Sequence, residues 1–245
     1  MKLLTVYEAS KIPRHPNFLF ASVVKSALQA SSPQMQLKMY HYTKDQANKE
    51  MRPFTGAIYL NDYTLENGEF TIHQDVRLTI SSPSAEFILN LYNGFVQKKN
   101  YKYQSYELSL AHIKMLPEKL PKTNRVLFKT LSPIVIKNQV GQYLDLDDEN
   151  YQTELNYAAN ELMKVVANRP IYEPIILTPI VMHKKVVQLK HDSFAALNAQ
   201  NILYMNAYEG TFLLEGHPED LNIFAQAGLG FRRSTFFGCI EMINE

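Results

Sequence analysis

The feature that most constrains the fold is one order of strand and helix patterns that occurs twice along the chain. In each half, alternating apolar runs typical of strands flank segments with apolar residues at three- and four-residue steps, which predict helices. In the first half, the order strand, helix, strand, strand, helix, strand falls at residues 3–9, 16–32, 52–60, 70–82, 82–97 and 105–116. In the second half, the same order falls at residues 125–137, 150–169, 174–190, 201–216, 217–230 and 235–243.

This order predicts an α+β fold made of two tandem ferredoxin-like (RRM-like, βαββαβ) domains. Each domain would place two helices on one face of a four-stranded antiparallel sheet and leave the other face open, as in RNA-recognition domains. The turn-rich stretch 117–124 marks the boundary, so we expect domains at residues 1–120 and 121–245. The polar segment 36–51, inside the first domain, predicts a loop or a short helical insert.

The charges are distributed unevenly, although the formal net charge is only +1. Residues 1–52 carry eight Lys and Arg against three Asp and Glu, and residues 98–125 carry seven against two. Two basic segments suit a surface for an anionic ligand, and they suit ordinary solvated faces equally well.

Cysteine content and apolar runs restrict the class of protein. The single cysteine, Cys239, excludes an internal disulfide and any metal site built from several thiolates. Its apolar surroundings predict a buried structural thiol. No apolar run reaches 18 residues and the N-terminal apolar stretch is too short for a signal peptide, so we expect a cytoplasmic protein without a membrane segment.

A glycine-rich stretch near the C-terminus, AGLGFRRSTFFGCIEM (227–242), indicates contact with phosphate. It is not a dinucleotide fingerprint, because the Gly-Leu-Gly at 228–230 follows a helix and Arg233 stands where the third glycine is required. The chain also lacks the Gly-Lys-Ser/Thr of the Walker pattern, so the sequence predicts no nucleotide cofactor. Glycines let backbone amides approach a phosphate, and Arg232 and Arg233 offer forked donors. An ordinary helix stop followed by a tight turn explains the glycines equally well.

In several of these stretches the chain resembles the CRISPR repeat-processing endoribonucleases of the RAMP superfamily. The stretch 228–242 resembles the glycine-rich loop of the superfamily, and 210–227 resembles the strand and helix that lead into it. Residues 130–137 resemble the opening strand of the second domain, and 52–60 resemble the second strand of the first. One departure is Phe236, which stands where the pattern has glycine.

The resemblance implies a metal-independent endoribonuclease that cuts precursor RNA inside each repeat. The ribose 2′-hydroxyl attacks the adjacent phosphate and leaves a 2′,3′-cyclic phosphate and a 5′-hydroxyl. Such a cut needs a base, an acid and cations for the developing charge. Members commonly keep the catalytic histidine between the first helix and the second strand, where this chain has His41. The catalytic candidates around it are Lys38, Lys44, Lys49, Tyr40 and Tyr42.

The other histidines have simpler interpretations. His15, at the start of the first helix, is the second choice for catalysis. His73, His112 and His183 lie in predicted strands and are expected to have structural roles, whereas His191 could touch a phosphate. His217 precedes Pro218 and is expected to cap a helix or lie on the surface.

The candidate RNA-binding residues lie mainly in the second half of the chain. They are Gly228, Gly230, Arg232, Arg233, Ser234, Arg52 and Lys190. No spacing of His, Cys, Asp or Glu predicts a metal site, and no cofactor is expected. The expected partner is CRISPR repeat RNA; other subunits of a CRISPR effector complex, or a second copy in a homodimer, stay open. The alternative function is a non-catalytic RAMP subunit that binds RNA within an effector complex.

Overall fold

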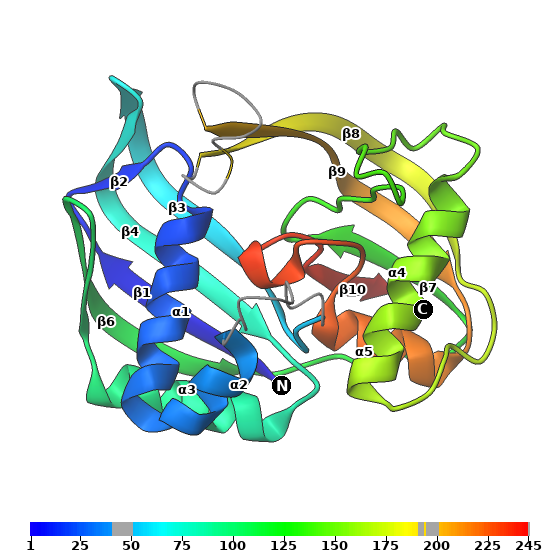
Figure 1. Ribbon diagram of the computed structural model, residues 1–245, viewed down its shortest axis with the longest axis horizontal. Coiled ribbons are helices and arrows are strands. Elements are labelled where there is room, and N and C mark those ends of the chain that lie inside the picture. Colours follow the sequence, from blue (N-terminus) through cyan, green and yellow to red (C-terminus); the bar gives the residue numbers. More distant parts are fainter. Residues whose placement is uncertain (41–50, 191–193, 195–200, 245) are drawn as a thin grey trace.

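The computed structural model describes residues 1–40, 51–190, 194 and 201–244, which form two antiparallel sheets with helices on one face of each (Figure 1). In both sheets the first and third main strands are central, which is the order of a ferredoxin-like fold. The fold class predicted from the sequence is therefore confirmed.

The N-terminal sheet is built around β1 (Lys2–Glu8). This strand pairs with β4 (Glu69–Ser81) on one side and with β6 (Tyr106–Leu116) on the other. β3 (Thr55–Glu66) pairs with the far side of β4, so the main strands run in the order β6-β1-β4-β3.

Two long helices cover one face of this sheet. They are α1 (Asn17–Ser31) and α3 (Ala85–Gln97), and the predicted apolar stripe of α1 is buried at Val24, Ala27 and Leu28. Helix α3 begins at a serine cap, where Ser84 Oγ accepts a hydrogen bond from the Phe87 amide (3.2 Å).

Three short elements of the N-terminal half were not predicted as such. β2 (Lys11–Pro13) and β5 (Asn100–Tyr103) extend the sheet, and α2 (Pro33–Tyr40) follows α1 directly. The segment expected to be a loop or short helical insert is thus helical up to Tyr40. Residues 41–50 lie outside the described residues.

The C-terminal sheet repeats the same order with other strands. β7 (Arg125–Thr130) pairs with β9 (Ile202–Glu215), and β9 pairs with the long strand β8 (Ile176–Lys190). β10 (Ile240–Asn244) pairs with the other side of β7, which gives the order β10-β7-β9-β8.

The helices of this half are α4 (Tyr151–Val166) and α5 (Pro218–Ala227). Their apolar sides contribute Leu155, Leu162 and Phe224 to the core. Throughout the described part of the chain, no helix has both the length and the apolar character needed to cross a bilayer.

The strand predicted at 125–137 is too long. It ends at Thr130, and the following residues leave the sheet, although an isolated bridge pairs Ile134 with Tyr208 of β9. Pro133 has no amide hydrogen to donate to a neighbouring strand, and its carbonyl accepts from the Gly238 amide instead (2.8 Å).

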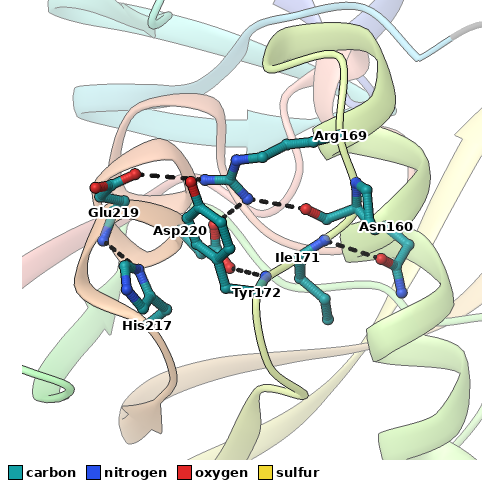
Figure 2. Close-up of polar contacts among 8 residues, drawn as sticks. Asn160, Arg169, Ile171, Tyr172, His217, Glu219 and Asp220 are labelled. Atoms are coloured by element: carbon teal, nitrogen blue, oxygen red, sulfur yellow. Dashed lines mark hydrogen bonds and ion pairs between the residues drawn. The ribbon is translucent and has the colours of Figure 1, made fainter.

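A polar network fastens the start of α5 to the segment that follows α4. Asp220 is fully buried, and its carboxylate pairs with Arg169 (2.7 Å) and accepts from the Tyr172 amide (2.7 Å). Figure 2 shows the Arg169 guanidinium pointing toward Glu219 and Asp220, with the Tyr172 ring alongside. The guanidinium carbon lies 3.6 Å from the centre of that ring, so the arginine both pairs and stacks.

The two halves are joined through the C-terminal loop. Figure 1 shows the short 3₁₀ turn η2 (Arg233–Thr235) beside α1, between the two sheets. Phe236, the next residue, is 2% exposed and packs with the N-terminal core, 6.5 Å from the ring of Phe20. Its ring lies over Gly56 of β3, where an added Cβ would approach it to 2.9 Å.

Candidate functional site

The glycine-rich loop between α5 and β10 is packed tightly against both halves of the molecule. Gly228 and Gly230 have φ angles of 81° and 75°, a region that side chains rarely adopt. An added Cβ on Gly228 would lie 2.8 Å from the Thr55 hydroxyl, and one on Gly230 would lie 2.5 Å from the Val135 carbonyl. Both glycines are therefore required for close approach of protein segments.

Several amides of this loop already donate within the protein. The Leu229 amide donates to Gly238 (2.9 Å), and the Phe231 amide donates to Val135 (2.9 Å). These two amides are therefore not free to donate to a phosphate, contrary to what the sequence had indicated. If the loop binds a phosphate, the donors are mainly the side chains that follow.

The two adjacent arginines have different environments. Arg233 is 4% exposed, and it donates to the carbonyls of Gly230 (3.1 Å) and Ala227 (2.9 Å). Burial lowers the pKa of its guanidinium to about 10. Arg233 therefore stabilises the loop from within, and its donors are directed at two carbonyls and at the Met51 sulfur rather than at a phosphate.

Arg232 lies nearer the surface, half-buried between the loop and the C-terminal sheet. Its Nε donates to the Tyr143 hydroxyl (2.9 Å), and its guanidinium lies 5.7 Å from the centre of the Phe194 ring. Phe194 in turn packs 6.0 Å from Phe18 of α1. Of the two predicted arginines, Arg232 is thus the one whose position suits an external anion.

A second group of predicted residues meets at the end of α2. Arg52 donates from Nε to the Met39 carbonyl (3.0 Å) and from Nη1 to the Ser234 hydroxyl (3.0 Å). Its guanidinium stacks 4.4 Å from the centre of the Tyr40 ring, and Lys25 Nζ lies 5.8 Å from the same ring. This cluster, named the Tyr40–Arg52 cluster below, joins the N-terminal domain to the glycine-rich loop.

Four catalytic candidates lie outside the described residues, as does His191. They are His41, Tyr42, Lys44 and Lys49. In sequence, His41 directly follows Tyr40 of the cluster. Lys38, on α2, lines a cavity of about 190 Å³ together with Arg52 and Ser84.

His15 and Lys190 lie close enough to interact electrostatically. Partial burial lowers the pKa of His15, and the positive charges of Arg14 and Lys190 lower it further. Asn17, two residues on, donates to the Thr235 carbonyl of the loop (2.8 Å). The second-choice histidine is therefore also next to the glycine-rich loop, at the start of α1.

The remaining histidines of the described chain lie away from this loop. His73, His112 and His183 are exposed on their strands, so the expected satisfied structural role is wrong for them: no hydrogen bond joins their side chains to other described residues. His217 caps α5 as predicted, its Nδ1 accepting from the Glu219 amide (3.4 Å). Cys239 is buried, as predicted.

A cavity of about 760 Å³ opens between the loop and α4. Its walls are formed by Arg52, Gly230 and the segment 231–234, and also by residues that the sequence did not single out: Lys137, Glu154, Tyr157 and Glu161. Of these four residues, Lys137 precedes α4 and the other three lie on α4. The sequence had one signal for them: Glu154, Tyr157 and Glu161 follow one another at three- and four-residue steps, which places them on one face of the helix. Among the described residues, no three His, Cys, Asp or Glu side chains gather as a metal site would require.

Comparison with known proteins agrees with this architecture. The family described as "CRISPR associated protein Cas6, C-terminal" matches residues 116–242. CRISPR-associated endoribonuclease Cas6 1 from Methanocaldococcus jannaschii is 23% identical over 241 residues, which cover 96% of this chain and 88% of that protein.

Solved structures show the same fold. The product of a Cas6-related gene from Pyrococcus furiosus superposes with a TM-score of 0.82 at 20% identity, over 100% of this chain and 99% of that one. A RAMP protein that binds different RNA substrates superposes with a TM-score of 0.79 at 17% identity, over 100% of both chains. The resemblance to the repeat-processing family is confirmed, and because the family match spans more than half of the sequence, the chain belongs to the Cas6 family of CRISPR-associated proteins.

Proposed function

We propose that this protein is an endoribonuclease that cuts CRISPR precursor RNA within its repeats. The observation that carries the proposal is the contact between the Tyr40–Arg52 cluster and Ser234 of the glycine-rich loop. This contact brings a basic, aromatic group of the N-terminal domain to the loop that is typical of RNA-binding RAMP proteins. Family membership and the named activity of the M. jannaschii relative support it.

The proposed reaction is metal-independent. His41, directly after Tyr40, accepts the proton of the ribose 2′-hydroxyl, and O2′ forms a bond to the adjacent phosphorus. The bond from phosphorus to O5′ breaks, and the leaving oxygen takes up a proton, which gives a 2′,3′-cyclic phosphate and a 5′-hydroxyl. Arg52 and Arg232 stabilise the charge that develops on the phosphoryl oxygens, with Lys38, Lys44 and Lys49 as further cations.

The proposed division of labour follows the two domains. Residues 1–120 supply the chemistry, through His41, Tyr40 and Tyr42, and residues 121–245 supply much of the RNA binding. Within the second domain, Gly228 and Gly230 shape the loop and Arg232, Ser234 and Lys190 face the RNA.

His15 is the second candidate for the catalytic base. Its lowered pKa keeps the imidazole neutral near pH 7, as a base requires, and it lies beside the cationic side chains of Arg14 and Lys190. His41 remains the first candidate for two reasons. It directly follows the Tyr40–Arg52 cluster, and it lies between the first helix and the second main strand, the region in which the family commonly has its catalytic histidine.

The test begins with RNA that co-purifies with the protein, whose ends identify the repeat. That repeat RNA is then incubated in EDTA with wild-type protein and with the His41→Ala and His15→Ala variants. We expect cutting by wild type and by His15→Ala, and loss of cutting by His41→Ala. Full cutting by His41→Ala would reject its role, and a deoxyribose just upstream of the cut should abolish cleavage.

One outcome would favour the alternative function. If wild-type protein binds the repeat RNA tightly and leaves it intact, the protein is a non-catalytic RNA-binding subunit. The likeness to a RAMP protein that binds different RNA substrates makes this the second candidate.

A further inference from the structure

The cavity between the glycine-rich loop and α4 has an unusual composition for a site beside an RNA backbone. One wall carries the cations Arg52, Lys137 and Arg232, whereas α4 contributes the carboxylates of Glu154 and Glu161. Carboxylates repel phosphate, so the α4 wall is unsuited to the RNA backbone. The volume of the cavity, about 760 Å³, lies within the range of small-molecule pockets, which have room for a nucleobase.

Glu154 is the most informative residue of this wall. It is only 8% exposed, yet no hydrogen bond or ion pair joins its carboxylate to another residue in the described part of the chain. Its oxygens are not among the fully enclosed side-chain atoms that lack a hydrogen-bond partner, so the carboxylate opens to the cavity, where it can accept from a donor on a ligand. Glu161 differs, because it pairs with Lys164 at 2.6 Å.

The same face of α4 offers an aromatic surface. Tyr157 is three residues after Glu154 and four before Glu161, so the three side chains project from one side of the helix. The Tyr157 side chain is 47% exposed and lines the cavity. Exposed aromatic rings are the usual platforms on which unpaired bases stack.

The opposite wall suits the sugar-phosphate part of the same nucleotide. Arg232 and Arg52 lie there with Ser234, and Lys137 stacks 5.2 Å from the centre of the Phe231 ring. A nucleotide placed across the cavity would therefore have its phosphate at the cationic wall and its base at the α4 wall.

We infer that this cavity is a specificity pocket for one nucleobase next to the cut, with Tyr157 stacking on the base and Glu154 accepting from its exocyclic amino group. Adenine, cytosine and guanine carry such a group, and uracil does not, so the pocket selects against uracil. The inference rests on the proposed function, since it assigns a base of the same RNA.

The test measures binding, so that it does not depend on catalysis. The probe is the repeat RNA with a deoxyribose at the cut, in which each base on either side of the cut is replaced in turn by uracil. For wild-type protein we expect one position at which uracil weakens binding about tenfold. Glu154→Gln should lose this preference, because the amide can donate to a uracil carbonyl as well as accept.

A matched control separates base recognition from general charge effects. Glu149→Gln removes the same charge from an exposed residue just before α4, and it should tighten binding of all RNAs alike without changing the preference. Tyr157→Ala should weaken binding of the repeat RNA. The same substitution should have no effect on RNA that lacks the base at the selected position, because there is then no base to stack on the ring.

The outcomes distinguish the two proposals. If wild type cuts the repeat but Glu154→Gln keeps the same base preference as Glu149→Gln, the pocket is wrong and the proposed function stands. If wild type neither binds nor cuts the repeat, the proposed function is wrong and the pocket is wrong with it, since the pocket assigns a base of that RNA. A tenfold uracil effect that Glu154→Gln does not reduce also overturns the pocket.

Discussion

At the scale of single residues, Phe236 joins the two halves of the molecule at a structural cost. Its backbone has φ 67° and ψ 49°, a left-handed conformation that costs a bulky residue roughly 1–2 kcal/mol. The ring compensates by packing against Phe20 and over Gly56 in the N-terminal core. The departure from the glycine of the family pattern thus has a packing function.

The strain and the packing of Phe236 can be separated by two substitutions. Phe236→Ala should lower the free energy of unfolding by about 3–5 kcal/mol, because a buried aromatic ring is lost. Phe236→Gly loses the same ring but removes the strain, so it should be about 1 kcal/mol more stable than Phe236→Ala. Urea denaturation measures both, and a glycine variant less stable than the alanine variant would contradict the left-handed backbone.

His15 gives a prediction about pH. Because burial and two neighbouring cations lower its pKa in the folded state, the unfolded chain binds a proton more readily. Stability should therefore fall as the pH drops below the ordinary histidine value of about 6.5. His15→Gln should reduce this loss between pH 7 and pH 5, measured by thermal unfolding across that range; an unchanged profile would contradict the shift.

The sequence could identify the arginine pair but not the difference between its members. Arg232 and Arg233 are adjacent and chemically identical, and both were expected to hold phosphate. The turn that follows α5 directs the carbonyls of Ala227 and Gly230 at Arg233 alone. Since burial here depends on the path of the loop in space, no local pattern of residues reveals it.

At the scale of elements, the network at the start of α5 should be one of the main stabilising contacts of the C-terminal domain (Figure 2). Arg169→Ala leaves the fully buried carboxylate of Asp220 without its counter-charge, which should cost about 3–5 kcal/mol. Arg125→Ala is the control, because its pair with Glu215 is exposed and should contribute less than about 1 kcal/mol. Equal losses in chemical denaturation would contradict a special role for this network.

Elements with a clear period were predicted well, but two strands were predicted too long. One is the strand expected at 125–137, and the other is the strand expected at 235–243, which begins only at Ile240. The apolar residues at three- and four-residue steps in α1 and α4 agree with the buried sides of these helices, because a helix that covers a sheet buries one side only. The strand expected at 125–137 was too long because Ile134, Val135 and Ile136 are all buried, although they lie in a packed loop. Apolar composition reports burial, and it does not report strand pairing.

At the scale of the whole molecule, the doubled order of elements was sufficient to predict both sheets. The way in which they join was not predictable, since it depends on contacts between residues far apart in sequence. Thr55 donates to the Phe237 carbonyl (2.8 Å) and Ser132 donates to the Gly56 carbonyl (2.9 Å). The candidate site lies at this junction, so its composition became visible only with the fold.

The proposed RNA site spans both domains, which predicts how binding depends on salt. Each phosphate contact with a cation releases counterions and contributes about 0.7 to the slope of log affinity against log salt for single-stranded RNA. Arg52→Gln in the N-terminal domain and Arg232→Gln in the C-terminal loop should each reduce the slope by about this amount, and the double variant by about twice as much. Arg233→Gln should leave the slope unchanged and lower stability instead, because its donors face groups of the protein. Filter binding of the uncleavable repeat RNA over a range of salt concentrations measures all four variants. If the double variant changed the slope no more than one single variant does, the RNA would not bridge the two domains.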